Sequence, residues 1–342
     1  MKFSEFKNKY EIIPVVHNQI NKIKNPLVSI CIQTYNQESY LSKCLDSVIN
    51  QKTDFDYEIL IGEDQSDDNT RYICMEYAKN FPEKISLFLH DRRNNIVINN
   101  LKTGRFNSIY NLFSARGKFI SFCEGDDFWI DEYKIQKQYN QCIDNNVNIC
   151  LTNYLWLKDK VFIEPKSFKK PKLDFFRLDL NKINEEHYHL SHLSTYFFNR
   201  KYLEYLFNHP MLFSSWGLDT LLMPIFFENG EVYFDKQKMS CYRLNNEGLS
   251  RMKEDGSGSI HKFKLHQFQQ LIKIHPTYKK FMHYKIMGNS LKYFCRSTDL
   301  RYFIIFLKSL IFFLRLKKIN FIVIELKKLM KIIIKDFVSW IK

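Results

Sequence analysis

Short apolar runs alternate with amphipathic segments along the first third of the chain. Four runs that close on polar residues are typical of buried strands: 27–36, 57–64, 84–91 and 118–127. Three segments between them predict helices: 39–51, 66–81 and 107–117. Strands that alternate with helices imply crossover connections, so the pattern predicts an α/β fold with a mostly parallel central sheet. We expect Gly117 to close the third helix just after its C-cap.

The pattern becomes mixed after residue 128 and helical near the end. We expect a helix over 131–146 and strands over 148–157 and 231–244, with a charged, irregular stretch over 158–190. A linker rich in Gly, Ser and charged residues then leads into a basic helical segment. The expected organisation is a lead-in, an α/β domain and a basic amphipathic helical C-terminal region, at 1–26, 27–250 and 260–342.

Composition narrows the class of protein. The chain has 342 residues, of which 45% are hydrophobic and 16% aromatic, so it can bury a large core and is not disordered. Its net charge of +14 favours an anionic partner, which can be nucleic acid, a membrane surface or a small molecule. No CxxC pair occurs among the eight Cys, which argues against a zinc ribbon. The start of the chain is unlike a signal peptide and no apolar run is long enough to span a bilayer, so we expect a cytoplasmic protein.

Carboxylates gather where two of the expected strands end. The stretch CEGDDFW carries Glu124, Asp126 and Asp127, and the stretch EDQSDDNT follows the second strand. Ligands of α/β sheets bind outside the carboxyl ends of the strands, and carboxylate oxygens suit Mg²⁺ or Mn²⁺ with substrate phosphates. A single acidic turn can simply cap the next helix in solvent. Two such turns at one edge favour a nucleotide bound together with a metal.

Three segments, in this order and spacing, carry a family resemblance: SICIQTYNQESYLSKCLDSVINQ, YEILIGEDQSDDNT and GKFISFCEGDDFW. Together they resemble the family 2 glycosyltransferases of GT-A fold over about residues 27–130, and more weakly to about 250. The variant EGDDFW, with Asn107 ahead of Gly117, resembles the bacterial branch that builds surface polysaccharides. The resemblance implies a GT-A nucleotide-diphospho-sugar transferase fold with a C-terminal helical segment.

The resemblance also implies a donor site. Its nucleotide-binding residues would be Gln33, Thr34, Tyr35, Asp64, Glu124 and Asp126. Asp126 would hold a Mn²⁺ or Mg²⁺ ion, with Asp127 as a further metal residue in support. Two positions depart from the family pattern, because Glu124 replaces the first Asp of the DxD pair and Gln65 replaces the usual Gly of the DDGS turn.

The second half of the resemblance implies an acceptor side. Ser194 and Thr195 would approach the donor phosphates or the acceptor. Asp219, in SWGLDTLL, would be the general base of an inverting displacement, although an acid there can also simply open a helix. Trp216 is expected to be a sugar-stacking platform or a core residue, and Arg243 a diphosphate contact or a surface ion pair.

The histidines give less evidence of a metal site than the carboxylates do. Relatives often carry a His near the metal after the last core strand, but this chain has Asn245 there, so that role is not transferred. In HYHLSH, residues 187–192, two histidines alternate without Cys or acid at zinc-ligand spacing. We expect edge-strand or acceptor-site histidines there rather than a zinc site.

Residues 301–342 hold ten Lys/Arg against two acids, interleaved with Ile, Leu and Phe. Such a segment favours a peripheral site on an anionic membrane, and packing on the chain's own catalytic domain is the alternative. Nucleic-acid binding is disfavoured because the cations alternate with aliphatic residues rather than covering a polar surface.

The resulting hypothesis is a metal-dependent, inverting glycosyltransferase of hexosyltransferase type. It would move a sugar from a nucleotide-diphosphate donor, most readily a UDP-sugar, to a hydroxyl of a surface polysaccharide or lipid-linked glycan at the cytoplasmic face of the membrane. Two alternatives remain open, a silent nucleotide-binding module of a membrane complex and a sugar nucleotidyltransferase. The second normally carries a Gly-rich loop after strand one, and QTYNQESY has no Gly. A dinucleotide oxidoreductase is disfavoured because no GxGxxG is present.

Overall fold

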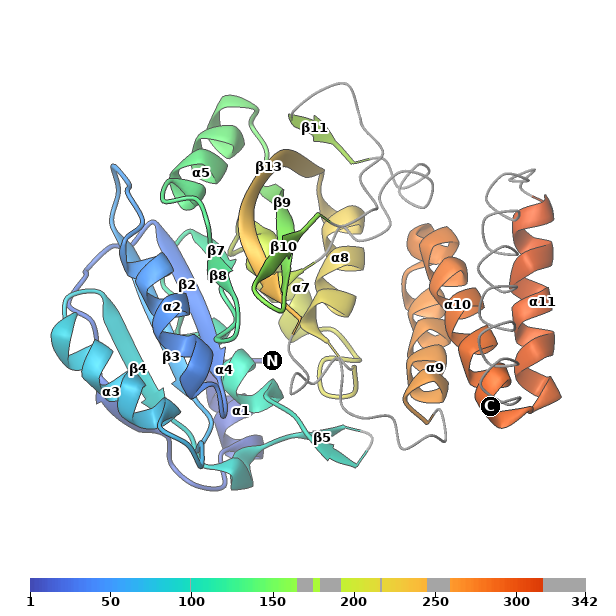
Figure 1. Cartoon of the computed structure of the whole chain (residues 1–342), viewed down its shortest axis with the longest axis horizontal. Coiled ribbons are helices and arrows are strands. Elements are labelled where there is room, and N and C mark those ends of the chain that lie inside the picture. Colours follow the sequence, from blue (N-terminus) through green and yellow to red (C-terminus); the bar gives the residue numbers. More distant parts are fainter. Residues whose placement is uncertain (99, 165–174, 179–191, 216, 245–258, 316–342) are drawn as a thin grey trace. The chain divides into compact units, whose positions relative to one another are not determined.

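The computed structural model describes residues 1–98, 100–164, 175–178, 192–215, 217–244 and 259–315 (Figure 1). The chain divides into two compact units. The first is made by residues 1–178 and 189–244, and the second by residues 179–188 and 245–342.

The first unit is organised around one large sheet. Its strands follow the order β1 (Val16–Gln19), β4 (Ile85–Leu89), β3 (Tyr57–Glu63), β2 (Val28–Thr34), β7 (Phe119–Phe122), β12 (Tyr196–Asn199), β9 (Ile149–Lys158), β13 (Val232–Arg243) and β11 (Phe175–Arg177). Two short strands lie off this path, β8 (Phe128–Trp129) beside β13 and β10 (Val161–Ile163) beside β9. A separate hairpin is formed by β5 (Val97–Ile98) and β6 (Leu101–Lys102).

The two halves of the sheet differ in strand direction. Strands β4, β3, β2 and β7 are parallel neighbours, as the alternating sequence pattern predicts. Beyond them, β12 runs antiparallel to both β7 and β9, while β13 is parallel to β9. The central sheet is therefore parallel from β4 to β7 and mixed from β12 onward. The fold class is the expected α/β class, with a larger antiparallel share than the sequence indicates.

Helices cover both faces of the sheet (Figure 1). They are α1 (Phe3–Tyr10), α2 (Glu38–Ile49), α3 (Thr70–Asn80), α4 (Arg105–Ser114), α5 (Lys134–Asp144), α7 (Tyr202–Phe207) and α8 (Leu218–Asn229). Buried residues of α2, α3 and α5 form one apolar cluster with β2, β3, β4 and β7. In α2, the apolar residues that the sequence pattern places on one helical face are the buried ones: Leu41, Cys44, Leu45, Val48 and Ile49. Leu87 of β4 belongs to that cluster, and the next residue, Phe88, points to the opposite face because side chains alternate along a strand. Tyr110 of α4 packs edge-on to Phe88, so α4 covers this opposite face.

The N-terminal residues contribute to this unit. Strand β1 pairs antiparallel with β4 at the edge of the sheet. In α1, Phe6 is fully buried, and its ring centre lies 5.1 Å from that of Phe106 in α4. The segment that the sequence suggested as a lead-in thus supplies an edge strand and a helix.

Gly117 has a different role from the expected one. Helix α4 ends at Ser114 with Ala115 as its C-cap, so Gly117 does not close it. A Cβ added at Gly117 would lie 2.5 Å from the backbone nitrogen of Ser29 in β2, while the Gly117 N–H donates to the Ser29 hydroxyl at 2.8 Å. The glycine therefore permits a close approach of two chain segments.

The second unit contains three helices among the residues described. They are α9 (Ser259–Ile274), α10 (Lys279–Ser297) and α11 (Leu300–Arg315), and α10 packs against both others. Met287 and Leu291 of α10 form an apolar core with Phe306 and Phe313 of α11. Within the described ranges, no helix has both the length and the apolar character needed to cross a membrane. Residues 316–342 of the expected basic region lie outside those ranges.

Candidate active site

The two acidic turns meet at the carboxyl edge of the parallel strands. The N–H of Asp64, which follows β3, donates to the Thr34 carbonyl at the end of β2, at 3.1 Å. The N–H of Gly125, which follows β7, donates to the Gln33 carbonyl at 3.1 Å. Both turns are therefore attached to the last two residues of the strand between them. The expected convergence of the acidic turns is what the structure shows.

Gly125 lets the Glu-Gly-Asp loop lie against the end of β2. A Cβ at this position would be 2.3 Å from Oε1 of Gln37 and 2.9 Å from Oγ1 of Thr34. These two side chains are themselves held together, because the Thr34 hydroxyl donates to Gln37 Oε1 at 2.8 Å. Any larger residue between Glu124 and Asp126 would have to push this loop away from the strand.

Asp64 lies in a small group of side chains suited to a planar ligand. Its Oδ2 accepts from Arg92 Nη1 at 3.0 Å and from Asn95 Nδ2 at 2.9 Å. The Arg92 guanidinium in turn lies 3.7 Å from the ring centre of Tyr35. Burial raises the pKa of Asp64 to about 6, against the opposing effects of Asn95 and Arg92.

Sequence reasoning missed Arg92 and Asn95. Both belong to the loop after β4, which begins with a short 3-10 turn at Arg92–Asn94. Since β4 is parallel to β3, this loop lies at the same edge as the acidic turns. The run of basic and amide residues directly after the third strand was the available signal.

The departure at Gln65 leaves the turn shape intact. Gln65 has a φ of 57°, in the left-handed region where glycine is usually found. This conformation costs a non-glycine residue roughly 1–2 kcal/mol. The Gln65 side chain compensates in part, because its Oε1 accepts from the Arg92 N–H at 2.8 Å. The Glu63 carboxylate also fixes the turn by accepting from the Ser66 N–H at 2.6 Å.

An imidazole completes the acidic loop. His192 Nε2 lies 3.2 Å from Oδ2 of Asp127 and 3.7 Å from Oε2 of Glu124. The possible ligand atoms of these three residues all lie within 4.8 Å of one another. The imidazole ring is held between Tyr154 and Tyr242, whose ring centres are 5.9 and 4.2 Å away. The sequence predicts edge-strand or acceptor-site histidines at 187–192 and does not assign His192 to the acidic loop, so His192 is a missed residue of this site.

Asp127 is anchored by two distant segments. The Ser194 hydroxyl donates to its Oδ2 at 2.9 Å, and the Arg243 N–H donates to its Oδ1 at 3.0 Å. The Thr195 hydroxyl donates to the His192 carbonyl at 2.8 Å, and both Ser194 and Thr195 are fully buried. In this structure Ser194 and Thr195 hold the acidic loop and His192 in place, and their contact with donor or acceptor stays a prediction.

Carboxyl groups gather at this site, and His192 supplies no positive charge to offset them. Burial and the charges of Asp126 and Asp219 raise the pKa of Glu124 to about 8. Burial raises the pKa of Asp127 well above its ordinary value, with Asp126 and Glu124 adding to the effect. Burial lowers the pKa of His192 to about 3, so its imidazole is neutral. A divalent cation is the species that would satisfy this set of oxygen and nitrogen atoms.

Asp219 lies in the first turn of α8, close enough to affect the acidic loop. Its charge raises the pKa of Glu124. Burial lowers the pKa of Arg105, and the charge of Asp219 opposes this effect by stabilising the guanidinium. Arg105 Nη2 donates to the Ser215 carbonyl at 2.7 Å, just before this helix. A Cβ at Gly217 would lie 2.2 Å from Oδ1 of Asp219, so the carboxylate folds back over the glycine. Asp219 is thus a helix-start acid whose charge also acts on the acidic loop.

Arg243 rests on aromatic rings. Its guanidinium carbon lies 4.7 Å from the ring centre of Phe128 and 5.3 Å from that of Tyr40. In the parts of the chain that the structure describes, Arg243 forms no ion pair, and its buried Nε has no hydrogen-bond partner. Trp216 and Asn245 lie outside the described residues.

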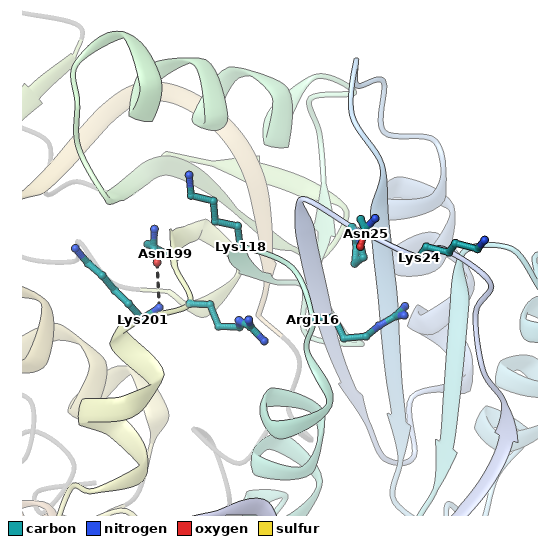
Figure 2. A pocket seen from close by; sticks show the side chains of 8 residues that line it. Lys24, Asn25, Arg116, Lys118, Asn199 and Lys201 are labelled. Carbon is teal, nitrogen blue, oxygen red and sulfur yellow. Dashed lines mark hydrogen bonds between the residues drawn. The ribbon is translucent and has the colours of Figure 1, made fainter.

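A basic hollow of about 610 Å³ occurs elsewhere in the first unit (Figure 2). It is lined by Lys24, Asn25, Pro26, Arg116, Lys118, Asn199, Arg200 and Lys201. These residues precede β2 and β7 or follow β12, so the hollow is at the opposite edge of the sheet from the acidic turns. Arg116 is already paired with the buried Glu58 carboxylate, through Nε at 2.9 Å. We therefore place the chemistry at the carboxyl edge and not in this hollow.

Comparison with solved structures gives the fold. Residues 1–349 of TarS from S. aureus, crystallised with UDP-GlcNAc, match with a TM-score of 0.59 at 15% identity, covering 83% of this chain and 79% of that fragment. The mannosyltransferase PcManGT from Pyrobaculum calidifontis, solved with GDP-Man and Mn²⁺, matches with a TM-score of 0.52 at 13% identity, covering 89% and 79%. At such identities the likeness shows the shared GT-A fold alone.

Comparison with curated proteins gives shorter but closer matches. An uncharacterized protein of Mycobacterium tuberculosis is 38% identical over 111 residues, which are 32% of this chain and 30% of that protein. The Escherichia coli protein WfgD, named as a UDP-Glc:alpha-D-GlcNAc-diphosphoundecaprenol beta-1,3-glucosyltransferase, is 31% identical over 129 residues, 37% of this chain and 46% of WfgD. The matches therefore span less than half the length of these relatives. The model of the family described as Glycosyl transferase family 2 matches residues 29–207, which is more than half of the chain and includes both acidic turns and His192, and the chain belongs to that family.

Proposed function

We propose that this chain transfers a sugar from a nucleotide-diphosphate donor to a hydroxyl group of a glycan, with inversion of the anomeric centre. The observation that carries the proposal is the meeting of the two acidic turns at one edge of the sheet, and the charge of Asp219 acts on one of them through Glu124. One turn is suited to the nucleotide, the other to a metal and the diphosphate, and the third acid to the acceptor proton.

The donor would bind along the end of β2. Asp64, Arg92 and Tyr35 form the group suited to the base, through hydrogen bonds and stacking on a planar ring. Gln33 and Thr34 lie between this group and the Glu-Gly-Asp loop. The WfgD name specifies UDP-Glc, and TarS was solved with UDP-GlcNAc, so a UDP-hexose is the donor that we propose.

The metal would be held by the acidic loop. Its possible ligands are Glu124, Asp127 and His192, with Asp126 next in the loop, and these oxygen and nitrogen atoms fit Mn²⁺ or Mg²⁺. The pKa values of both carboxyl groups are raised, and the neighbouring imidazole is neutral. When bound, such an ion stabilises the negative charge that develops on the diphosphate leaving group. Arg243, held on two aromatic rings without an ion pair among the described residues, would contribute a further positive charge to the diphosphate.

Asp219 would act as the general base. Its carboxylate takes the proton of an acceptor hydroxyl while that oxygen attacks the anomeric carbon from the side opposite the nucleotide. The bond between the anomeric carbon and the diphosphate oxygen breaks as the new glycosidic bond forms. One displacement of this kind inverts the anomeric centre, with the acceptor proton ending on Asp219 and the bonding electrons on the diphosphate leaving group.

The acceptor would be a surface polysaccharide or a lipid-linked glycan. The WfgD name specifies a diphosphoundecaprenol-linked acceptor, and we extend the same class to this chain as a proposal. Peripheral attachment to the cytoplasmic face of a membrane, through residues 301–342, is the matching proposal for location. Of that segment, the structure describes residues 301–315.

The deciding experiment is turnover with purified protein, a panel of UDP- and GDP-hexoses, Mn²⁺ and a lipid-diphosphate glycan acceptor. Formation of a glycosylated product that requires both Mn²⁺ and Asp219 supports the proposal. Calorimetric titration of UDP with and without Mn²⁺, beside Asp126→Ala, separates binding from catalysis. A silent nucleotide-binding module would bind UDP without forming product, and a nucleotidyltransferase would release pyrophosphate from a nucleoside triphosphate.

A further inference from the structure

Helix α11 exposes a regular apolar stripe. Leu300, Ile304, Leu307, Ile311 and Leu314 are 67%, 49%, 37%, 47% and 49% exposed. They follow one another at intervals of four, three, four and three residues. At 3.6 residues per turn, this spacing places all five side chains on one narrow face of the helix. Scattered apolar residues are common on protein surfaces, but a continuous row along a whole helix marks an interaction surface.

This stripe is separate from the core of the second unit. Phe306 and Phe313, on another face of α11, are 2% and 1% exposed and pack with Met287 and Leu291 of α10. The helix therefore has one apolar face that is used inside the bundle and a second that is not covered by the described residues of the bundle.

A row of cations runs beside the stripe. Arg301, Lys308 and Arg315 are exposed, follow one another at seven-residue intervals, and each comes directly after a leucine of the stripe. Helix α11 contains no Asp or Glu. The whole segment 259–315 has eleven Lys/Arg against one acid, Asp299, a net charge of +10. The Asp299 carboxylate is paired with Arg301 at 2.7 Å, which leaves the other two cations of the row without an ion pair among the described residues.

We propose that this face of α11 docks on an anionic lipid surface, with the helix axis parallel to the membrane plane. The five apolar side chains would enter the boundary between headgroups and acyl chains, and the adjacent cations would contact the phosphates. The proposal gives the membrane attachment within the proposed function a defined face, and it can be measured without any transfer reaction. The described part of α11 has 16 residues interrupted by Lys308, too few to cross a bilayer, which fits a position on the membrane surface.

The charge distribution argues against a second copy as the occupant. An apolar stripe at this spacing is also found in paired helices, where charges beside the stripe determine the partner. Two copies of α11 would bring together two rows of cations with no carboxylate from either helix. Such like-charge contacts disfavour self-pairing, whereas anionic headgroups are complementary to the row.

The test is co-sedimentation of the full chain with vesicles, with and without phosphatidylglycerol in a phosphatidylcholine background. The triple variant Ile304→Gln, Leu307→Gln, Ile311→Gln removes the stripe while keeping good helix formers. We expect its vesicle affinity to fall at least tenfold, with an unchanged helical circular dichroism signal and unchanged UDP binding. The matched control is Val161→Gln, Phe162→Gln, Ile163→Gln in β10, whose side chains are 60%, 51% and 38% exposed, and it should bind vesicles as the parent chain does.

A second variant tests the cation row. Arg301→Gln, Lys308→Gln, Arg315→Gln should lower the preference for phosphatidylglycerol and weaken the salt dependence of binding. Unchanged binding of the stripe variant to either vesicle would overturn the proposal. If the stripe variant binds vesicles as before but has a lower mass than the parent chain by analytical ultracentrifugation, the stripe is a self-association surface and the proposal is overturned.

Discussion

His192 Nε2 lies 3.2 Å from Oδ2 of Asp127, and the two residues, distant in sequence, flank the neighbouring strands β7 and β12. Asp127 follows β7, whereas His192 precedes the 3-10 turn Leu193–Thr195 that leads into β12. The family resemblance placed an imidazole after the last core strand, where this chain has Asn245. The structure brings an imidazole to the acidic loop from another segment, so loss of that His in the sequence does not mean loss of a nitrogen donor.

We expect His192→Ala to weaken Mn²⁺ binding about 10- to 100-fold, the range typical for residues that bind a metal or orient its ligands. The measurement is a titration of Mn²⁺ followed by electron paramagnetic resonance in the absence of donor. His266→Ala, at an exposed position of α9, is the matched control and should leave the affinity unchanged. Equal Mn²⁺ affinity in His192→Ala and the parent chain would show that the imidazole only packs between Tyr154 and Tyr242.

Protons should compete with the metal in the neutral pH range. Because burial and the neighbouring acids raise the pKa of Glu124 to about 8, this carboxyl is mostly protonated at pH 6 and half ionised near pH 8. A raised carboxyl pKa stabilises the metal-free fold below the unfolded pKa, and that contribution disappears as the pH rises through the folded value. Mn²⁺ should therefore increase the melting temperature more at pH 8.5 than at pH 6.

The check is a pair of thermal melts at each pH, with and without Mn²⁺, on the parent chain and on Glu124→Gln. The glutamine variant cannot ionise at this position, so the pH dependence of the Mn²⁺ effect should be smaller in it. A Mn²⁺ effect that is equal at the two pH values in the parent chain contradicts the assignment of Glu124 to the metal loop.

Gly125→Ala tests the close packing of the acidic loop. The added methyl group would lie 2.3 Å from Gln37 Oε1 and 2.9 Å from Thr34 Oγ1, so the loop must move away from β2. We expect the affinity for UDP and Mn²⁺, measured by calorimetry, to fall at least tenfold. The residues proposed to bind the base and those proposed to bind the diphosphate would no longer be at the right distance from each other. Gly104→Ala is the control, since a Cβ there has nothing within 4 Å. Full affinity in Gly125→Ala would mean that the loop position is not important for binding.

Local sequence patterns predicted where the two acidic turns meet. The strands β2, β3 and β7 are short apolar runs, and a parallel sheet must bring their carboxyl ends to one edge, so the two acidic turns had to meet. The resemblance predicted the same edge, because its motifs lie on these strand ends.

The second half depends on contacts between segments that are distant in sequence. Nothing local in YFFN specifies that β12 inserts antiparallel between β7 and β9, and that insertion is what brings His192 and Ser194 to Asp127. Gly117 is a similar case, since a glycine after a helix reads as a helix end until the approach of Ser29 is known. Long-range pairing, and not local propensity, decided each of these positions.

Asp219→Asn separates catalysis from donor binding. The amide keeps the size of the side chain over Gly217 but cannot accept the proton of the acceptor hydroxyl, so the rate of product formation should fall about 10²- to 10⁴-fold. UDP–Mn²⁺ affinity should remain within about threefold, or increase slightly because one negative charge near Glu124 is removed. The measurement combines product formation under saturating donor with a calorimetric UDP titration. Glu228→Gln, at the exposed far end of α8, removes one charge from the same helix and should leave both quantities unchanged. If Asp219→Asn forms product at nearly the parental rate, another group takes the proton, and the position of Asp219 would then serve only to begin α8.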